Sequence, residues 1–216
     1  MNDYKMAKYA QEMQNRYSCG HEQMEKRPYL IVYESNDYIL GFPLTSRAKQ
    51  LKSYPSHTNA RLSTNKLDGE VMLDQLQFIH KADFTNLPKT SVPDTDYQAI
   101  IDSLVSQIIK AKENPKKDVL NCPNFCDIIS LTHNIPEFLH INKWLVVSSK
   151  HFNAYAKMCF IIPYSNDLDF GYLHSIDWEA RGVNIINKLK YAEQDIQALQ
   201  QAIKTKFTSI CGYFAH

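Results

Sequence analysis

The chain has 216 residues, which is enough for one large domain or two small ones with a buried core. Its 44% hydrophobic and 22% charged residues are ordinary for a globular protein, and a formal net charge of +1 points to no class of partner. The six glycines form neither a Gly-x-Gly-x-x-Gly nor a Walker pattern, which argues against a glycine-rich phosphate loop.

The five cysteines are scattered and no signal peptide precedes them, so we expect free thiols in a reducing cytoplasm. Cys122 and Cys126 are the only close pair, and no second Cys or His pair stands at zinc-finger spacing. No metal or other cofactor is therefore expected. No apolar run approaches the roughly 18 residues of a membrane-spanning helix, which indicates a protein that is neither secreted nor integral to a membrane.

Residues 3–16 contain no glycine or proline. Their apolar residues Met6, Tyr9, Ala10 and Met13 would share one helical face. This spacing predicts a short amphipathic helix that packs on the sheet formed by the next segments.

Two apolar, strongly β-prone stretches follow at 28–33 and 38–46, with turn-forming residues between them. Pro43 is poorly tolerated inside a central strand, so the chain should leave the sheet near Thr45. Pairing of the two strands would bring Arg27 and Thr45 to one end of the sheet. Arginine has five fixed donors and threonine one that rotates, which suits a phosphate, although the same residues also fit an ordinary strand flank and turn.

The segment from Tyr38 to Leu67 contains no acidic residue, and its positive charges all follow the strand that ends near Thr45. Such a segment is either a solvated loop or a loop that follows a nucleic-acid backbone, and its length favours a function. The candidate residues for binding a nucleic acid in this segment are Ser46, Arg47, Lys49, Lys52, Tyr54, His57 and Arg61.

Residues 70–80 read as a strand pair or one bent strand, in which Gln75 needs a hydrogen-bond partner if it is buried. An amphipathic helix follows from about 95 to 113, and the polar stretch 112–118 is the best candidate for a linker.

Beyond this linker the pattern of strands followed by a helix starts again, which indicates an internal duplication with domains at 1–115 and 119–216. The second helix should cover about 192–210. The strands of the second half are expected at 127–131, 143–149, 158–165 and 169–178.

Four short motifs stand in order in the first half, namely Gly20-x-Glu22-Gln23, Arg27-Pro28, Pro43-x-Thr45-Ser46 and Asp74-Gln75. In this order and spacing they resemble the motifs of the MazF/PemK family of toxin ribonucleases. The first half lacks the usual opening strand of that family, and the expected N-terminal helix stands in its place.

The second half resembles the same family less completely. Residues 126–129 are similar to its opening strand, 175–182 to the segment after its Asp-Gln pair, and 191–199 to the entry of its last helix. Lys143 and Ser165 stand for the arginine and the threonine, and the Glu-Gln and Asp-Gln pairs are absent.

The resemblance implies an α+β, mainly β chain of two small SH3-like barrels of the CcdB/MazF type. Each barrel would be followed by a C-terminal helix, and the two would form a pseudo-dimer. It further implies a cytoplasmic toxin that cleaves single-stranded RNA at short sequences without a metal, leaving 2′,3′-cyclic phosphate and 5′-OH ends. Arg27 and Thr45 would be catalytic, and Glu22, Gln23 and Gln75 would bind substrate together with the loop residues. A protein antitoxin is the expected partner, and two barrels in one chain should act as a monomer.

Two other functions stay open. One is a barrel pair that binds RNA or a protein without cleaving it, which Lys143 and Ser165 favour for the second half. The other is a gyrase-poisoning toxin of the CcdB type, against which the Arg-Pro and Thr-Ser motifs argue. Arginine is a poor base at its usual pKa, so His21 or His57 would have to supply that role, and each also fits an ordinary loop histidine.

Overall fold

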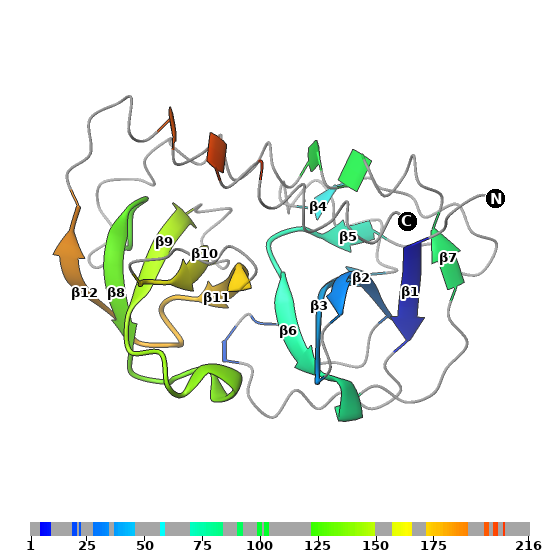
Figure 1. The fold of residues 1–216 in the computed structure, drawn as a ribbon, viewed down its shortest axis with the longest axis horizontal. Coiled ribbons are helices and arrows are strands. Elements are labelled where there is room, and N and C mark those ends of the chain that lie inside the picture. The colour runs from blue at the N-terminus through cyan, green and yellow to red at the C-terminus, as the bar shows by residue number, and fades with distance from the viewer. Residues whose placement is uncertain are drawn as a thin grey trace. The chain divides into compact units, whose positions relative to one another are not determined.

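The computed structural model describes residues 5–9, 19–20, 22, 28–34, 37–45, 57–58, 70–83, 90–92, 99–100, 102–103, 122–149, 157–165, 172–189, 197–198, 201–202 and 205. The chain forms two compact units, each built mostly of antiparallel strands (Figure 1). Unit 1 comprises Met1–Arg16, Gln23–Leu104 and Thr208–His216, and unit 2 comprises Tyr17–Glu22 and Val105–Phe207. The contiguous division into 1–115 and 119–216 remains a prediction. Within the described ranges, no helix is long and apolar enough to cross a membrane.

Unit 1 contains a seven-stranded antiparallel sheet in the order β4-β5-β3-β2-β1-β7, with β6 also paired to β3. A short 3-10 helix, Lys81–Asp83, follows β6. The strands are β1 (Lys5–Tyr9), β2 (Pro28–Glu34), β3 (Tyr38–Thr45), β4 (His57–Thr58), β5 (Glu70–Met72), β6 (Gln77–His80) and β7 (Thr90–Val92).

The hairpin of β2 and β3 confirms the two strands that the sequence predicts. Gly41 is required in it, because a Cβ there would lie 2.8 Å from the carbonyl oxygen of Leu30 on β2. The outer edge of β3 pairs with β6 up to Gly41 and with β5 from Leu44 onward. Pro43 lies between these two partners, where its missing N–H interrupts neither ladder. The strand ends at Thr45, as predicted.

The prediction of a helix over residues 3–16 is wrong for Lys5–Tyr9, which form the strand β1. The other residues of this range lie outside the described ones. This strand pairs with β2 on one edge, Ala7 opposite Leu30, and with β7 on the other, Ala7 opposite Thr90. Pairing on both edges satisfies the backbone groups of β1, whereas a short helix is marginal in water by itself. The first half therefore has a strand ahead of its Gly-x-Glu-Gln motif.

Unit 2 contains a five-stranded antiparallel sheet in the order β11-β10-β9-β8-β12. The four strands predicted for the second half are present, with β11 shorter than expected, whereas β12 was not predicted. The residues of β12 are half-buried or exposed, so their hydrophobic pattern is too weak to predict a strand. The strand forms because it pairs with β8. The strands are β8 (Asp127–Leu131), β9 (Trp144–Ser149), β10 (Met158–Pro163), β11 (His174–Asp177) and β12 (Val183–Lys188).

The core of unit 2 contains an aromatic cluster around the 3-10 helix Pro136–Phe138. The ring of Phe138 stacks on His174, and Trp144 meets His174 edge to face. His174 is fully enclosed, and its Nδ1 lies 2.9 Å from the carbonyl oxygen of Tyr172. Burial lowers the pKa of His174 to about 4, so the ring is neutral at physiological pH.

The two predicted helices lie mostly outside the described residues. The residues that are described in them are helical, and Ile100 is buried as its place on the apolar face predicts. The lengths of both helices stay predictions. The helical positions are 99–100 and 102–103 in the first segment and 197–198, 201–202 and 205 in the second.

The four described cysteines, Cys19, Cys122, Cys126 and Cys159, are free, as the sequence predicts. Burial, together with the nearby charge of Asp127, raises the pKa of Cys122 to about 11 and that of Cys126 to about 12. Both thiols therefore stay protonated and unreactive at neutral pH.

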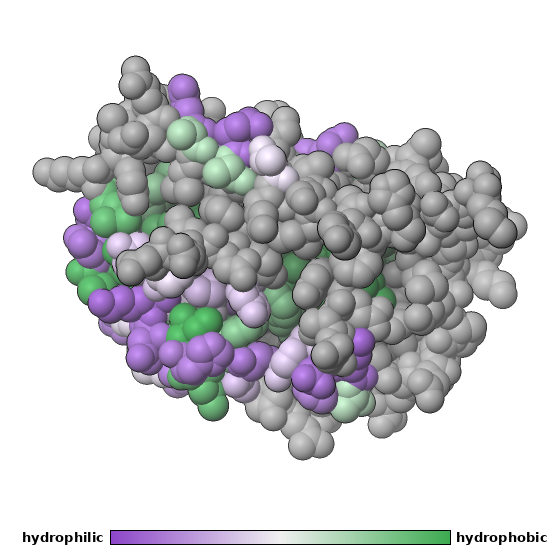
Figure 2. All heavy atoms as spheres, viewed as in Figure 1, coloured by the Kyte–Doolittle hydropathy of each residue, from purple (hydrophilic) through white to green (hydrophobic). Residues whose placement is uncertain are grey.

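On the face drawn in Figure 2, described hydrophobic residues (green) reach the surface in separate groups among hydrophilic ones (purple). The large hydrophobic residues described as exposed are Leu139, Tyr164, Tyr172 and Ile186. Single exposed side chains of this kind are common in folded proteins and mark no interface by themselves.

Candidate active site

The end of β3 is where the sequence predicts catalysis. Thr45 is the last residue of β3 and is 7% exposed. It pairs directly with Glu70, the first residue of β5. At the same end, Tyr29 of β2 pairs with Pro43. Arg27 comes one residue before β2 in the sequence and lies outside the described residues.

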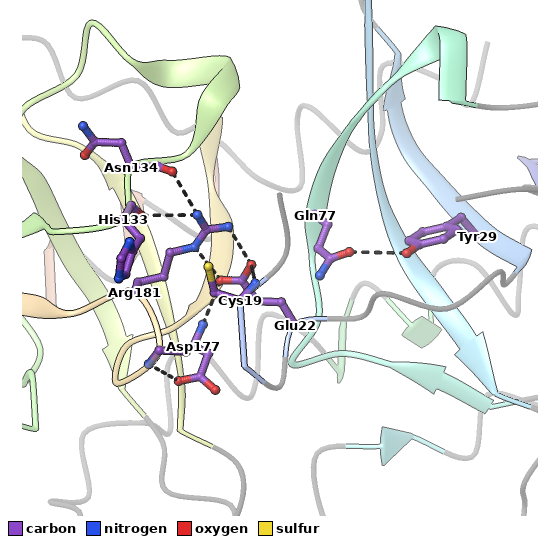
Figure 3. Close-up of polar contacts among 9 residues, drawn as sticks. Cys19, Glu22, Tyr29, Gln77, His133, Asn134, Asp177 and Arg181 are labelled. Atoms are coloured by element: carbon purple, nitrogen blue, oxygen red, sulfur yellow. Dashed lines mark hydrogen bonds and ion pairs between the residues drawn. The ribbon is translucent and has the colours of Figure 1, made fainter. Parts of the chain in front are cut away.

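Several buried polar side chains share one face of this sheet. Directly paired residues of antiparallel strands point to the same face, as do alternate residues along a strand. By these two rules Thr45, Glu70, Tyr29 and Gln77 lie on one face. The hydroxyl of Tyr29 donates to Oε1 of Gln77 over 3.3 Å (Figure 3). The opposite face carries apolar core residues, among them Leu30, Phe42, Leu44 and Val71.

Glu70 is the functional candidate that the sequence analysis missed. It is 4% exposed, and burial raises the pKa of its carboxyl above the ordinary value. Its Oε2 has no hydrogen-bond partner among the residues that the structure describes. The sequence offered one signal for Glu70: a charged residue stands between a turn and the apolar run Val71–Leu73, where burial is expected.

The other predicted substrate-binding residues are described only in part. Gln75 is buried, and its backbone N–H donates to the carbonyl of Met72 over 3.1 Å, which closes the turn after β5. His57 belongs to β4 and pairs with Met72. The remaining candidates lie outside the described residues, namely Gln23, Ser46, Arg47, Lys49, Lys52, Tyr54 and Arg61.

Glu22, from the Gly-x-Glu-Gln motif, lies in unit 2, where it pairs with Arg181 of the second half. Nε of Arg181 donates to Oε1 over 2.8 Å and Nη2 donates to Oε2 over 2.6 Å (Figure 3). Nη1 donates to the carbonyls of His133 and Asn134. Burial by itself lowers the pKa of Arg181, but the hydrogen bonds and charge of Glu22 outweigh it and raise the pKa.

The carboxylate of Glu22 has its acceptor positions filled. Besides Arg181, the backbone N–H of Asp177 donates to Oε1 and that of Cys19 donates to Oε2. A carboxylate offers about four such positions, so binding RNA through Glu22 would require one of these bonds to break. Gly20 fits the same contact, since it has a φ of +58° and a Cβ there would collide with Asp177 and Ala180.

The counterparts in the second half, Lys143 and Ser165, are both exposed. Trp144 pairs with Pro163, and the N–H of Tyr164 donates to the carbonyl of Lys143 over 3.0 Å. Tyr164 therefore lies opposite Lys143. Ser165 follows one residue later, beyond the end of β10, so it is not the residue that stands opposite Lys143 in the backbone register.

Among the described residues, no three His, Cys, Asp or Glu side chains gather where they would hold a metal ion.

One comparison with known proteins bears on this site. Residues 13–108 match the sequence model of a family described as PemK-like, MazF-like toxin of type II toxin–antitoxin systems. The match includes all four motifs of the first half. No curated protein sequence matches the chain. The resemblance to the MazF/PemK family is confirmed for residues 13–108.

Proposed function

We propose that this protein is a toxin that cleaves single-stranded RNA without a metal ion, because residues 13–108 match the family of PemK-like, MazF-like type II toxins. Endoribonuclease activity is general in that family. The observation that carries the proposal to this chain is the register of β2 and β3. Tyr29 lies opposite Pro43, Arg27 precedes Tyr29 by two residues, and Thr45 follows Pro43 by two.

In the proposed reaction Arg27 and Thr45 hold the scissile phosphate. The guanidinium of Arg27 neutralises its charge, and the hydroxyl of Thr45 donates to a non-bridging oxygen. The ribose 2′-OH attacks the phosphorus and the 5′-oxygen leaves, which gives a 2′,3′-cyclic phosphate and a 5′-OH. Donors aimed at charge that develops in the transition state are the usual source of such catalysis.

The basic loop that follows Thr45 would hold the RNA strand. Its Lys and Arg side chains neutralise backbone phosphates, and Tyr54 would stack on a base, a contact worth about 1–3 kcal/mol. Gln75 and Gln23 would contact bases or sugars. The proposed loop residues are Ser46, Arg47, Lys49, Lys52, Tyr54, His57 and Arg61.

A type II toxin family implies a protein antitoxin as partner. We expect the antitoxin to cover Arg27 and the basic loop, because an acidic segment there would compete with RNA phosphates. Expression of the protein without its antitoxin should stop growth and translation. Unchanged growth and translation would contradict the toxin assignment.

The decisive experiment is RNA cleavage by purified protein in EDTA. We expect single-stranded RNA to be cut into products with 2′,3′-cyclic phosphate and 5′-OH ends. Sequencing RNA ends after induction in growing cells identifies the preferred cut sequence. A requirement for Mg²⁺, or products with 3′-OH ends, would overturn the mechanism.

For the second half we propose a different role, RNA binding without cleavage. The supporting observation is that Tyr164 lies opposite Lys143, so that Ser165 is out of register with the lysine. Lysine also lacks the planar fork that grips two phosphate oxygens.

A further inference from the structure

Neither of the two residues proposed to hold the scissile phosphate is a proton acceptor. The 2′-OH must lose its proton as it attacks, and a positioned base for such a transfer typically contributes about 10²–10⁴-fold in rate. Arginine is protonated at any physiological pH, and a threonine hydroxyl is a donor or weak acceptor. Neither Arg27 nor Thr45 can therefore take the proton.

The carboxylate of Glu70 is placed for this task. It lies directly opposite Thr45 in the antiparallel pair of β3 and β5, so the two Cβ atoms are about 4.5–5.5 Å apart on the same face of the sheet. A phosphate held by the Thr45 hydroxyl brings the neighbouring ribose within reach of the longer glutamate side chain. Tyr29 and Gln77, which share this face, are buried as well.

We propose that Glu70 is the general base of the RNA cleavage, an inference that rests on the proposed function. Its carboxylate takes the proton from the 2′-OH, the freed electron pair on O2′ forms the bond to phosphorus, and the bond from phosphorus to O5′ breaks. The leaving O5′ takes a proton from solvent water. Glu70 then returns its own proton to solvent.

Burial suits Glu70 to this role, because it favours the neutral acid and makes the carboxylate a stronger base than an exposed one. A second buried carboxyl, that of Asp74, lies in the turn that follows β5 and is 3% exposed. β3 contributes the uncharged Thr45, and β4 contributes His57, which pairs with Met72. Glu70 is the carboxylate that pairs directly with Thr45.

The test compares the wild type with Glu70→Gln, Glu70→Asp and, as a control, Glu179→Gln, which alters an exposed carboxylate of unit 2. The substrate is a single-stranded RNA oligonucleotide with the cut sequence found by end mapping. Its analogue with 2′-deoxyribose at the cut position measures binding without reaction. Rates are recorded in EDTA from pH 4 to pH 9, and unfolding temperatures confirm that each variant is folded.

We expect Glu70→Gln to lower kcat about 10²–10⁴-fold, with KM and affinity for the deoxy analogue changed less than about twofold. The fall in wild-type rate at acid pH should disappear in this variant, and Glu70→Asp should recover part of the rate. Glu179→Gln should match the wild type. A purely structural role would instead change KM, the binding of the analogue or the unfolding temperature.

The possible failures are distinguishable. If the wild type does not cut RNA in EDTA, the proposed function falls and the role of Glu70 falls with it. If the wild type cuts RNA, and Glu70→Gln has the wild-type rate and the same fall in rate at acid pH, only the role of Glu70 is overturned. If Glu70→Gln does not fold, the wild-type profile decides, because a rate that is flat between pH 4 and pH 8 overturns the proposal.

Discussion

Thr45 and the residues around it divide the proposed chemistry among side chains of different kinds. Arg27 brings a permanent charge with fixed donors, Thr45 one rotating hydroxyl, and Glu70 an acceptor. Lys143 and Ser165 bring a charge and a hydroxyl as well, but Tyr164 occupies the position opposite the lysine. The two halves should therefore respond differently to the same kind of substitution.

Alanine substitutions test this asymmetry. Arg27→Ala and Thr45→Ala should each lower the rate of RNA cleavage about 10²–10³-fold, because each removes a donor aimed at developing charge. Lys143→Ala and Ser165→Ala should leave the rate within about threefold and at most weaken RNA binding. The measurement is single-turnover cleavage in EDTA. Equal losses from Arg27→Ala and Lys143→Ala would indicate two working sites.

His174 should make unit 2 sensitive to acid. Its pKa is about 4 in the folded protein against 6.5 ordinarily, so the unfolded chain binds the proton first as pH falls. Stability is full above about pH 6.5 and declines toward pH 4, by on the order of 3 kcal/mol. Urea unfolding followed by tryptophan fluorescence reports on this unit, because both tryptophans of the chain, Trp144 and Trp178, belong to it. His174→Phe should flatten the decline, and an unchanged slope would contradict the assignment.

At the scale of elements, unit 2 incorporates a short segment of the first half. Gly20 and Glu22 lie against the turn that follows β11, where Glu22 pairs with Arg181 and Gly20 leaves room for Asp177. In sequence, the two partners come from a Gly-x-Glu-Gln motif and an Ala-Arg-Gly segment in opposite halves. Two segments that each resemble part of the family pattern therefore meet in one unit.

Glu22→Gln should destabilise unit 2 strongly, although residue 22 stands in the other half of the sequence. The substitution leaves the Arg181 guanidinium buried without its counter-charge, which typically costs about 3–5 kcal/mol. Tryptophan fluorescence should show a lower urea midpoint. The double variant Glu22→Gln/Arg181→Met should recover part of the loss. The control Glu179→Gln, which breaks a more exposed pair with Lys157, should cost less than about 1 kcal/mol.

A midpoint for Glu22→Gln equal to that of Glu179→Gln would mean that the pair with Arg181 contributes nothing to unit 2. In that case the segment 19–22 would have to be held by its backbone contacts alone.

At the scale of the whole molecule, one chain contains two antiparallel sheets in two compact units. The presence of two units in one chain supports our proposal that the protein acts without a second copy of itself. The tandem duplication of closed barrels stays a prediction. Neither described sheet is closed by the pairings of the described residues.

The protein should therefore be active as a monomer. Light scattering coupled to size exclusion should give the mass of one 25.0 kDa chain at concentrations where RNA is cut. Activity per mole should be independent of protein concentration, because no association step precedes catalysis. Activity that rises with the fraction of dimer would contradict this.

The amino-acid sequence by itself determined the strands β2, β3 and β8 to β11, the end of β3 at Thr45 and the free state of the four described cysteines. These features follow from local signals, namely period-two apolar patterns, turn residues and the backbone limits of proline. Only the tertiary structure decided that Lys5–Tyr9 form a strand, that Thr45 lies opposite Glu70 and that Glu22 pairs with Arg181. Each of these depends on a partner far along the chain, up to 159 positions away for Arg181, and local spacing carries no information about which distant residue supplies it.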